Sequence, residues 1–208
     1  MSKIPAYKRS GVWITKHNSY FSFAHEERKR FFLSLEELKN LESGIRKKFS
    51  NDPEYLDVAL HVESESVRGD AYRHATSMLL YLCMSVEGFI NNYGAVRMSP
   101  KYYRDNIERQ NLAKKVSLIM GICFQEIIDP NDNVLRNIKA MFEERNQLVH
   151  PKTRELDHDN LAQYENEHPA DLEVDKYFNY VDDFVGWFSK YDDTLDKTFE
   201  FNPREKSV

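Results

Sequence analysis

The chain has 208 residues, of which 41% are hydrophobic and 13% aromatic, and its net charge is −5 at pH 7. This length suits a single domain, and so many aromatic side chains exclude an intrinsically disordered chain. No stretch approaches the ~20 consecutive apolar residues of a membrane span, and the acidic balance argues against a tight non-specific nucleic-acid binder. The sequence starts without the apolar block of a signal peptide, and its two scattered cysteines favour a reducing compartment. We therefore expect a soluble cytoplasmic domain that does not enter a membrane.

The N-terminal third of the chain predicts a short β element followed by a helix. Two β-prone runs within residues 11–23 flank the polar stretch 16–19 and predict a small hairpin. The next segment, about residues 24–49, places apolar residues on one helical face, namely Phe31, Leu35, Leu38, Ile45 and Phe49. The sequence Asn51-Asp52-Pro53 then breaks this helix.

Helical periodicity dominates the rest of the chain. A second helix is predicted from about Asp70, which follows Gly69 and has the side chain of an N-cap. A third helix is predicted from about Asp105 to Ile127, and a loop at 129–132 ends it and caps a fourth helix. A polar loop follows at about 151–170, and a last helix is predicted at about 171–197. Long helices with short connections predict an all-α, antiparallel bundle of four to five helices. We assign residues 1–65 to an N-terminal segment that packs on the bundle, 66–200 to the bundle and 201–208 to a tail.

An arginine interrupts the apolar stripe of the fourth predicted helix. The stripe advances by three or four residues at each step, through Leu135, Ile138, Phe142, Arg145 and Val149. A guanidinium at such a position is costly unless it is paired or lines a polar cleft. Glu87 lies at the edge of the apolar face of the second predicted helix, and we predict that it forms an ion pair with Arg145. Such a pair could equally serve only to fix the register of the two helices.

A histidine follows this arginine at the end of the same helix. Pro151 disfavours the α conformation at His150, so the helix should fray there and allow the imidazole to turn toward Arg145. An arginine can hold a phosphate with two hydrogen bonds, a histidine can transfer protons near neutral pH, and Asn146 can orient either one. Two basic residues that follow are candidates for substrate contacts, Lys152 and Arg154. These groups suffice for phosphodiester cleavage without a metal.

Two segments resemble a known family. Residues 144–152, which contain Arg145, Asn146 and His150, resemble the signature of HEPN domains, and residues 85–91 resemble an acidic-aromatic-Asn helix common in that superfamily. The resemblance covers about residues 70–195. It implies a helical bundle that dimerises, so that two Arg/His motifs share one cleft, and a metal-independent endoribonuclease of a toxin–antitoxin or antiviral defence system. It also implies that the RNA 2′-hydroxyl attacks the adjacent phosphate while His150 exchanges the proton, Arg145 stabilises the developing charge and Glu87 orients Arg145.

The implied partners are RNA, a second copy of the chain and a neighbour-encoded antitoxin or regulatory protein. We expect no cofactor and no metal, because the His- and acid-rich residues of the polar loop lack zinc-type spacing: His158, Asp159, Glu165, Glu167 and His168. Lys114 and Lys115 are expected on a solvated face. The alternative function is a non-catalytic helical module that binds a nucleotide or a protein, in which case His150→Ala would have no effect in an RNA assay.

Overall fold

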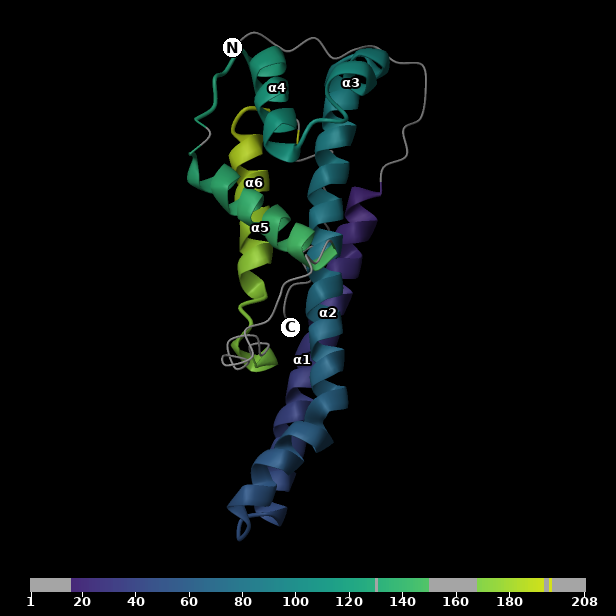
Figure 1. Ribbon diagram of the computed structural model, residues 1–208. Helices are drawn as coiled ribbons and strands as arrows, with labels where there is room; N and C mark the ends of the chain where they lie inside the picture. Colours follow the sequence, from purple (N-terminus) through teal and green to yellow (C-terminus); the bar gives the residue numbers. More distant parts are fainter. Residues whose placement is uncertain (1–15, 130, 150–167, 193–194, 196–208) are drawn as a thin grey trace, which may run out of the picture.

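The computed structural model is all-helical over the residues that it describes, which are 16–129, 131–149, 168–192 and 195 (Figure 1). Its elements in chain order are α1 (His17–Lys48), α2 (Pro53–Arg97), α3 (Pro100–Asn106), α4 (Leu112–Phe124), α5 (Asn133–Val149), the 3₁₀ turn η2 (Pro169–Asp171) and α6 (Asp175–Ser189). Within these ranges, none of the helices combines the length and apolar character that crossing a membrane requires.

The longest feature is the antiparallel pair formed by α1 and α2 (Figure 1). Buried residues recur every seven positions in both helices: His17, Ala24, Phe31, Leu38 and Ile45 in α1, and Ser64, Ala71, Met78 and Ser85 in α2. A repeat of seven keeps one seam of a helix turned toward its partner, as in coiled coils. The seam thus combines bulky side chains, such as Phe31 and Met78, with small ones, such as Ala24 and Ala71.

The α1–α2 pair extends beyond the other helices at its lower end (Figure 1). With 45 residues, α2 is about 68 Å long at ~1.5 Å per residue. The protruding tip has a small apolar core of its own, formed by Ile45, Ala59 and Leu60. The upper part of α2 belongs instead to the main core, and α2 contacts every other described element.

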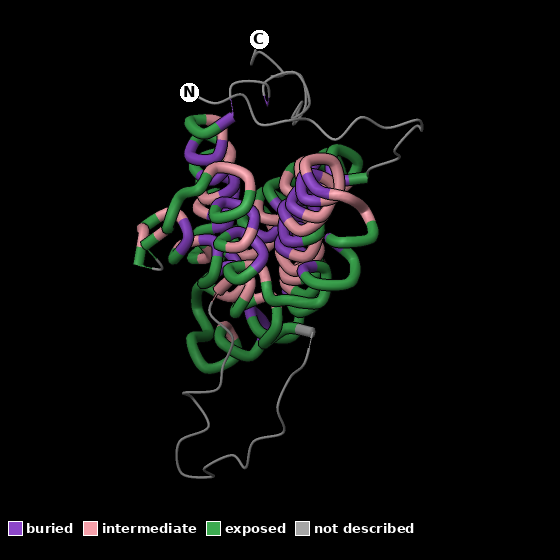
Figure 2. Tube along the Cα trace, turned by 90° about the horizontal axis from the view of Figure 1, so that it is seen from above, coloured by how far each residue is buried: buried purple, intermediate pink, exposed green. Residues whose placement is uncertain are grey.

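Side-chain caps set the boundaries of the helices that surround α2. The capping residues and the backbone N–H groups that they accept from are Asp52 with Tyr55, Ser99 with Tyr102, Asn111 with Lys114, and Asp132 with Val134. At the other end of α4, Gln125 adopts a left-handed conformation with φ of 59°. Helices α3, α4 and α5 each contact α2. Seen from above, the buried residues gather toward the inside of the molecule and the exposed ones lie around them (Figure 2).

Two predicted features near the N-terminus are wrong. The described part of the predicted hairpin belongs to α1, because Phe21 points to the core from a helical position, whereas residues 11–15 lie outside the described residues. The second helix begins at Pro53 rather than near Asp70, with Asp52 as its N-cap. Packing against α1 continues along α2 through Gly69, so the local N-cap signal is overridden by tertiary contacts.

The third predicted helix, from about Asp105 to Ile127, has both ends misplaced. Asp105 belongs to the end of α3, a turn follows at about residues 107–111, and α4 begins only at Leu112; Ile127 lies beyond α4 with 99% of its surface exposed. The predicted break before Pro53, the cap at Asp132 and a last helix within residues 171–197 are confirmed. The proposed boundary between residues 65 and 66 falls inside α2. Most of the predicted polar loop, and the tail at 201–208, lie outside the described residues.

Candidate functional site

A cavity of about 530 Å³ opens between α2, α4 and α5. Its apolar wall consists of Leu112, Val116, Leu135, Ile138 and Phe142. Three of the predicted site residues also line it, namely Glu87, Arg145 and Asn146. The fold thus brings part of the predicted site together at one hollow.

Arg145 occupies this cavity with its Nε atom buried and without a hydrogen-bond partner. Its guanidinium carbon lies 5.3 Å from the centre of the Phe142 ring, a distance at which cation and ring attract one another. Within the described part of the chain, no carboxylate forms an ion pair with Arg145. Arg145 therefore lies on the inner side of α5, as its place in the apolar stripe indicates.

The predicted ion pair between Glu87 and Arg145 is not formed. Glu87 Oε1 instead accepts a hydrogen bond of 3.0 Å from Lys115 Nζ, which donates a second bond of 3.0 Å to Asn91 Oδ1. The same Asn91 oxygen accepts from the hydroxyl of Tyr103 at 2.7 Å. The Lys115 side chain is only 2% exposed, whereas that of Glu87 is 43% exposed. The expectation of a solvated Lys115 is wrong, because this buried network supplies its ammonium with two acceptors.

Gly94 allows the tyrosine of this network to approach α2. A Cβ atom at Gly94 would lie 2.2 Å from Cε2 of Tyr103, so no larger residue fits there without displacing the ring. Burial raises the pKa of Tyr103 above its ordinary value, and the carboxylates of Glu108 and Glu87 add to this effect. The phenol therefore stays protonated and remains a donor to Asn91.

Of the described charged side chains that line the cavity, all except Arg145 are paired with an opposite charge. Glu87 is compensated by Lys115, and Lys139 Nζ lies 3.6 Å from Glu143 Oε1 in an exposed pair. Among the described charged residues that line the cavity, this leaves Arg145 as the one without a counter-charge. An uncompensated guanidinium beside an apolar wall is suited to an anion.

Cys83 lies near this arginine and does not supply a nucleophile. Burial raises the pKa of the Cys83 thiol to about 12, although the charge of Arg145 and a hydrogen bond with its side chain oppose the rise. Its Sγ atom is 3.8 Å from the carbonyl oxygen of Met141. Since only the thiolate is reactive, chemistry at this cavity would have to use other groups.

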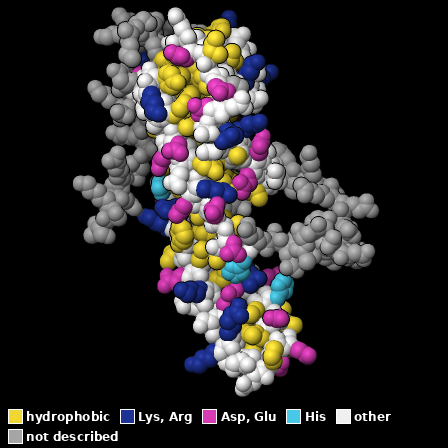
Figure 3. All heavy atoms as spheres, turned by 90° about the vertical axis from the view of Figure 1, so that its left-hand side faces the viewer, with side chains coloured by type: hydrophobic (Ala, Val, Ile, Leu, Met, Phe, Trp, Pro, Cys, Tyr) yellow, Lys and Arg dark blue, Asp and Glu magenta, His cyan; other side chains and the backbone are white. Residues whose placement is uncertain are grey.

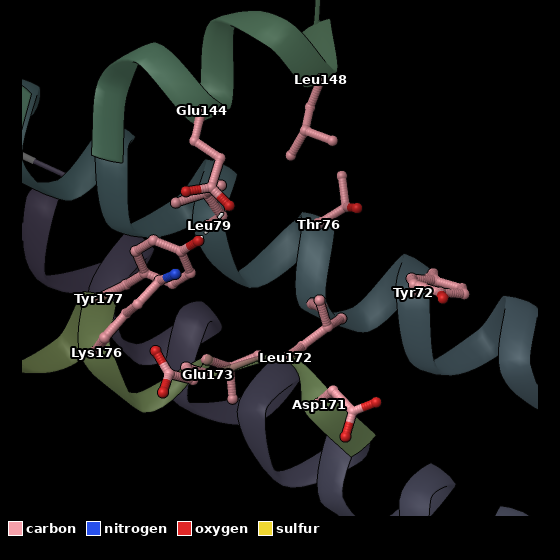
Figure 4. A pocket seen from close by; sticks show the side chains of 12 residues that line it. Tyr72, Thr76, Leu79, Glu144, Leu148, Asp171, Leu172, Glu173, Lys176 and Tyr177 are labelled. Atoms are coloured by element: carbon pink, nitrogen blue, oxygen red, sulfur yellow. Dashed lines mark hydrogen bonds between the residues drawn. The ribbon is translucent and has the colours of Figure 1, made fainter. Parts of the chain in front are cut away.

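A second cavity, of about 480 Å³, is lined by other residues of α5 than the first (Figure 4). Glu144 and Leu148 enter it from α5, and the hydroxyl of Tyr177 in α6 donates a hydrogen bond to Glu144. Asp171 and Glu173 add two more carboxylates. This acidic lining disfavours a phosphate, so the two cavities differ in the ligands that they suit.

Three predicted site residues cannot be placed, because His150, Lys152 and Arg154 lie outside the described residues. Of the predicted His- and acid-rich residues, His168 is described, and its Nε2 lies 3.2 Å from Glu42 Oε1. No group of three or more potential metal ligands occurs in the described part of the chain.

On the face drawn in Figure 3, basic and acidic side chains are interspersed along the length of the molecule, with hydrophobic groups between them. A broad basic surface of the kind that holds nucleic acid non-specifically is not seen on this face. An anion would thus depend on a local group such as Arg145.

Comparisons with protein-family models, curated proteins and solved structures gave no significant match. The geometry of the site is therefore the basis for its functional interpretation.

Proposed function

We propose that the chain is a metal-independent endoribonuclease in which Arg145 holds the phosphate that is cleaved. The observation that carries this proposal is the guanidinium of Arg145 in the cavity between α2, α4 and α5, which no carboxylate of the described residues compensates. Arginine binds phosphate oxygens with a planar pair of N–H donors, and its charge is present at every physiological pH. Asn146 lines the same cavity and can add a donor.

In the proposed reaction, the 2′-hydroxyl of a ribose attacks the adjacent phosphorus. The P–O5′ bond breaks, so that one product ends in a 2′,3′-cyclic phosphate and the other begins with a 5′-hydroxyl. His150 accepts the proton of the 2′-hydroxyl and returns a proton to the departing O5′. Arg145 stabilises the negative charge that develops on the phosphate oxygens. Lys152 and Arg154 are proposed to contact the RNA backbone on either side.

The role first assigned to Glu87 changes in this proposal. Because Glu87 pairs with Lys115, it does not orient Arg145 directly. Lys115 instead satisfies the carboxylate and leaves the guanidinium available to RNA. Glu87 and Lys115 would thus affect the reaction only indirectly, because their pairing leaves the charge of Arg145 without a carboxylate partner.

The resemblance to HEPN domains adds a biological setting to the proposal. It favours a helical bundle that forms a homodimer, a toxin or antiviral defence role in the cytoplasm, and a neighbour-encoded regulator. A dimer would bring two copies of Arg145 and His150 into one cleft. Light scattering behind size-exclusion chromatography measures the mass of the particle, and a monomer at micromolar concentration would contradict this part of the proposal.

The enzymatic proposal is tested by RNA cleavage in the presence of EDTA. Purified wild-type protein should cleave single-stranded RNA, whereas His150→Ala and Arg145→Gln should each lose about 10²-fold or more in rate. Arg136→Gln is the matched control, because Arg136 is an exposed arginine of the same helix whose side chain bonds Asn133. Folded wild-type protein that cuts no RNA, or His150→Ala that cuts at the wild-type rate, would refute the proposal.

A non-catalytic binding module is the second candidate. The cavity of about 530 Å³ falls within the ~300–1,000 Å³ that is typical of small-ligand sites. A wild-type protein that binds nucleotides tightly but cleaves no RNA, with no effect of His150→Ala on either property, would favour this function.

A further inference from the structure

We infer that the cavity between α2, α4 and α5 receives one unpaired base of single-stranded RNA, with the base against the apolar wall and its phosphate on Arg145. The inference rests on the proposed function for the choice of RNA, and it adds the requirement that the strand be unpaired at this nucleotide. Three features of the cavity support it: an apolar wall, a rim of side-chain amides and a cation, Arg145, that no described carboxylate pairs with.

The apolar wall offers a surface for the face of a base. Val116 and Ile138 are buried members of the core that also line the cavity, and the ring of Phe142 is half-buried beside them. Arg145 lies over that ring at 5.3 Å. An aliphatic and aromatic surface next to a guanidinium is the environment in which single-stranded bases stack.

Three amide side chains surround this wall at its exposed edge: Gln110, Asn111 and Asn146. Each amide carries both a donor and an acceptor, as the edges of nucleobases do. The Oδ1 atom of Asn111 already accepts from the Lys114 N–H at 3.0 Å, which leaves its Nδ2 group to donate. A ligand that was only apolar, such as an acyl chain, would leave these amides unused.

The anion of the ligand is placed by Arg145. The carboxylates of the cavity are already engaged by lysines, at 3.0 Å for Glu87 and 3.6 Å for Glu143. The first residues of α4, Leu112 and Ala113, also line the cavity, so the partial positive charge of this helix end adds to that of the guanidinium. The second cavity is also lined by a cation, Lys176, and by the start of α6, but it contains three carboxylates, those of Glu144, Asp171 and Glu173.

The shape of the site excludes a paired base. The wall is formed by residues of α4 and α5 that belong to the core, and a base can contact it only after leaving its stack. Duplex RNA presents its phosphates and 2′-hydroxyls to a protein and keeps its base faces covered. The cavity thus requires RNA that is single-stranded or splayed at the bound nucleotide.

The test is isothermal titration of the full chain with each of the four nucleoside 5′-monophosphates, with adenosine and inorganic phosphate as separate arms. At least one monophosphate should saturate the protein and bind more tightly than either arm. Arg145→Gln should weaken it about tenfold or more, and Ala113→Trp should weaken it similarly by filling the cavity mouth from an exposed position. The matched controls Arg136→Gln and Ala140→Trp lie on exposed positions of α5 outside the lining and should bind as the wild type does.

The inference would be overturned if none of the four monophosphates showed saturable binding. It would also be overturned if Ala113→Trp bound the monophosphates as tightly as the wild type. RNA cleavage by the same proteins separates this failure from that of the proposed function. If wild type and Ala113→Trp cleave single-stranded RNA equally, the nuclease stands and the base site falls. If the nucleotides bind as expected but no RNA is cleaved, the site stands and the nuclease falls. Cleavage of a duplex at the single-strand rate would also contradict the base site.

Discussion

Removing either partner of the ion pair between Glu87 and Lys115 should destabilise the protein by very different amounts. Lys115 is 2% exposed and Glu87 is 43% exposed. In Glu87→Leu the buried ammonium keeps only the oxygen of Asn91 as acceptor, and an uncompensated buried charge costs about 3–5 kcal/mol. In Lys115→Met the remaining carboxylate is hydrated by water, and the apolar chain of Met replaces the lysine stem, so we expect a loss of about 1 kcal/mol.

The double variant Glu87→Leu/Lys115→Met completes a thermodynamic cycle. Its stability should lie within about 1 kcal/mol of that of Lys115→Met, because the costly unpaired ammonium is absent from both. The two single effects should therefore be non-additive by about 3–5 kcal/mol, which is the cost of the unpaired ammonium. Urea unfolding followed by circular dichroism at neutral pH measures all four free energies, and equal slopes would show that the variants unfold from equally compact states.

An opposite order of the two single variants would refute this reasoning. If Lys115→Met is the more costly change, the ammonium is not the group that depends on its partner. Additive effects of the two substitutions would show that the side chains do not interact in solution. Either result would also remove the reason for regarding Glu87 as compensated and Arg145 as free.

Two further predictions concern glycines and a buried histidine. Gly94→Ala should lower the free energy of unfolding by about 1–3 kcal/mol, because its Cβ would clash with Tyr103. Gly69→Ala should raise it by about 0.5–1 kcal/mol, because no atom lies within 4 Å of the added Cβ. Thermal melts in which both variants shift in the same direction would contradict the packing described. Burial lowers the pKa of His17 from 6.5 to about 4. Between pH 6.5 and pH 4, the unfolded chain therefore binds a proton at His17 that the folded chain does not bind. The free energy of unfolding should fall by up to about 2 kcal/mol from pH 7 to pH 5. In His17→Leu this part of the pH dependence should disappear from urea unfolding curves, and an unchanged dependence would exclude His17 as its source.

The fold of α1 and α2 was only partly predictable from the sequence. Phe31, Leu38 and Ile45 mark the buried seam of α1 by their spacing of seven. The sequence-based prediction misplaced the start of α2, because Gly69-Asp70 has the composition of a helix N-terminus. In the structure, packing against α1 keeps these residues in the middle of a helix. Local propensity cannot indicate that α1 lies alongside these residues and stabilises the helix through them.

The candidate site, too, was only partly predictable from the sequence. Arg145 was found because it interrupts an apolar stripe, and the same signal was present at Lys115, which lies three residues after Leu112 and four before Ile119. The adjacent Lys114 made the pair resemble a solvated charged face. Which cation meets Glu87 depends on distances between three helices, and no spacing within one helix contains that information.

The proposed function depends most on the guanidinium of Arg145, which forms no ion pair with a carboxylate of the described residues and is proposed to bind a phosphate. This role of Arg145 is tested most directly by thermal melts of wild type and Arg145→Met with and without a 2′-O-methyl single-stranded RNA, which can bind but lacks the attacking hydroxyl. The variant should melt close to the wild type without RNA, and only the wild type should be stabilised by RNA. A variant that melts far below the wild type without RNA, yet retains the full RNA-dependent shift, would contradict the claim.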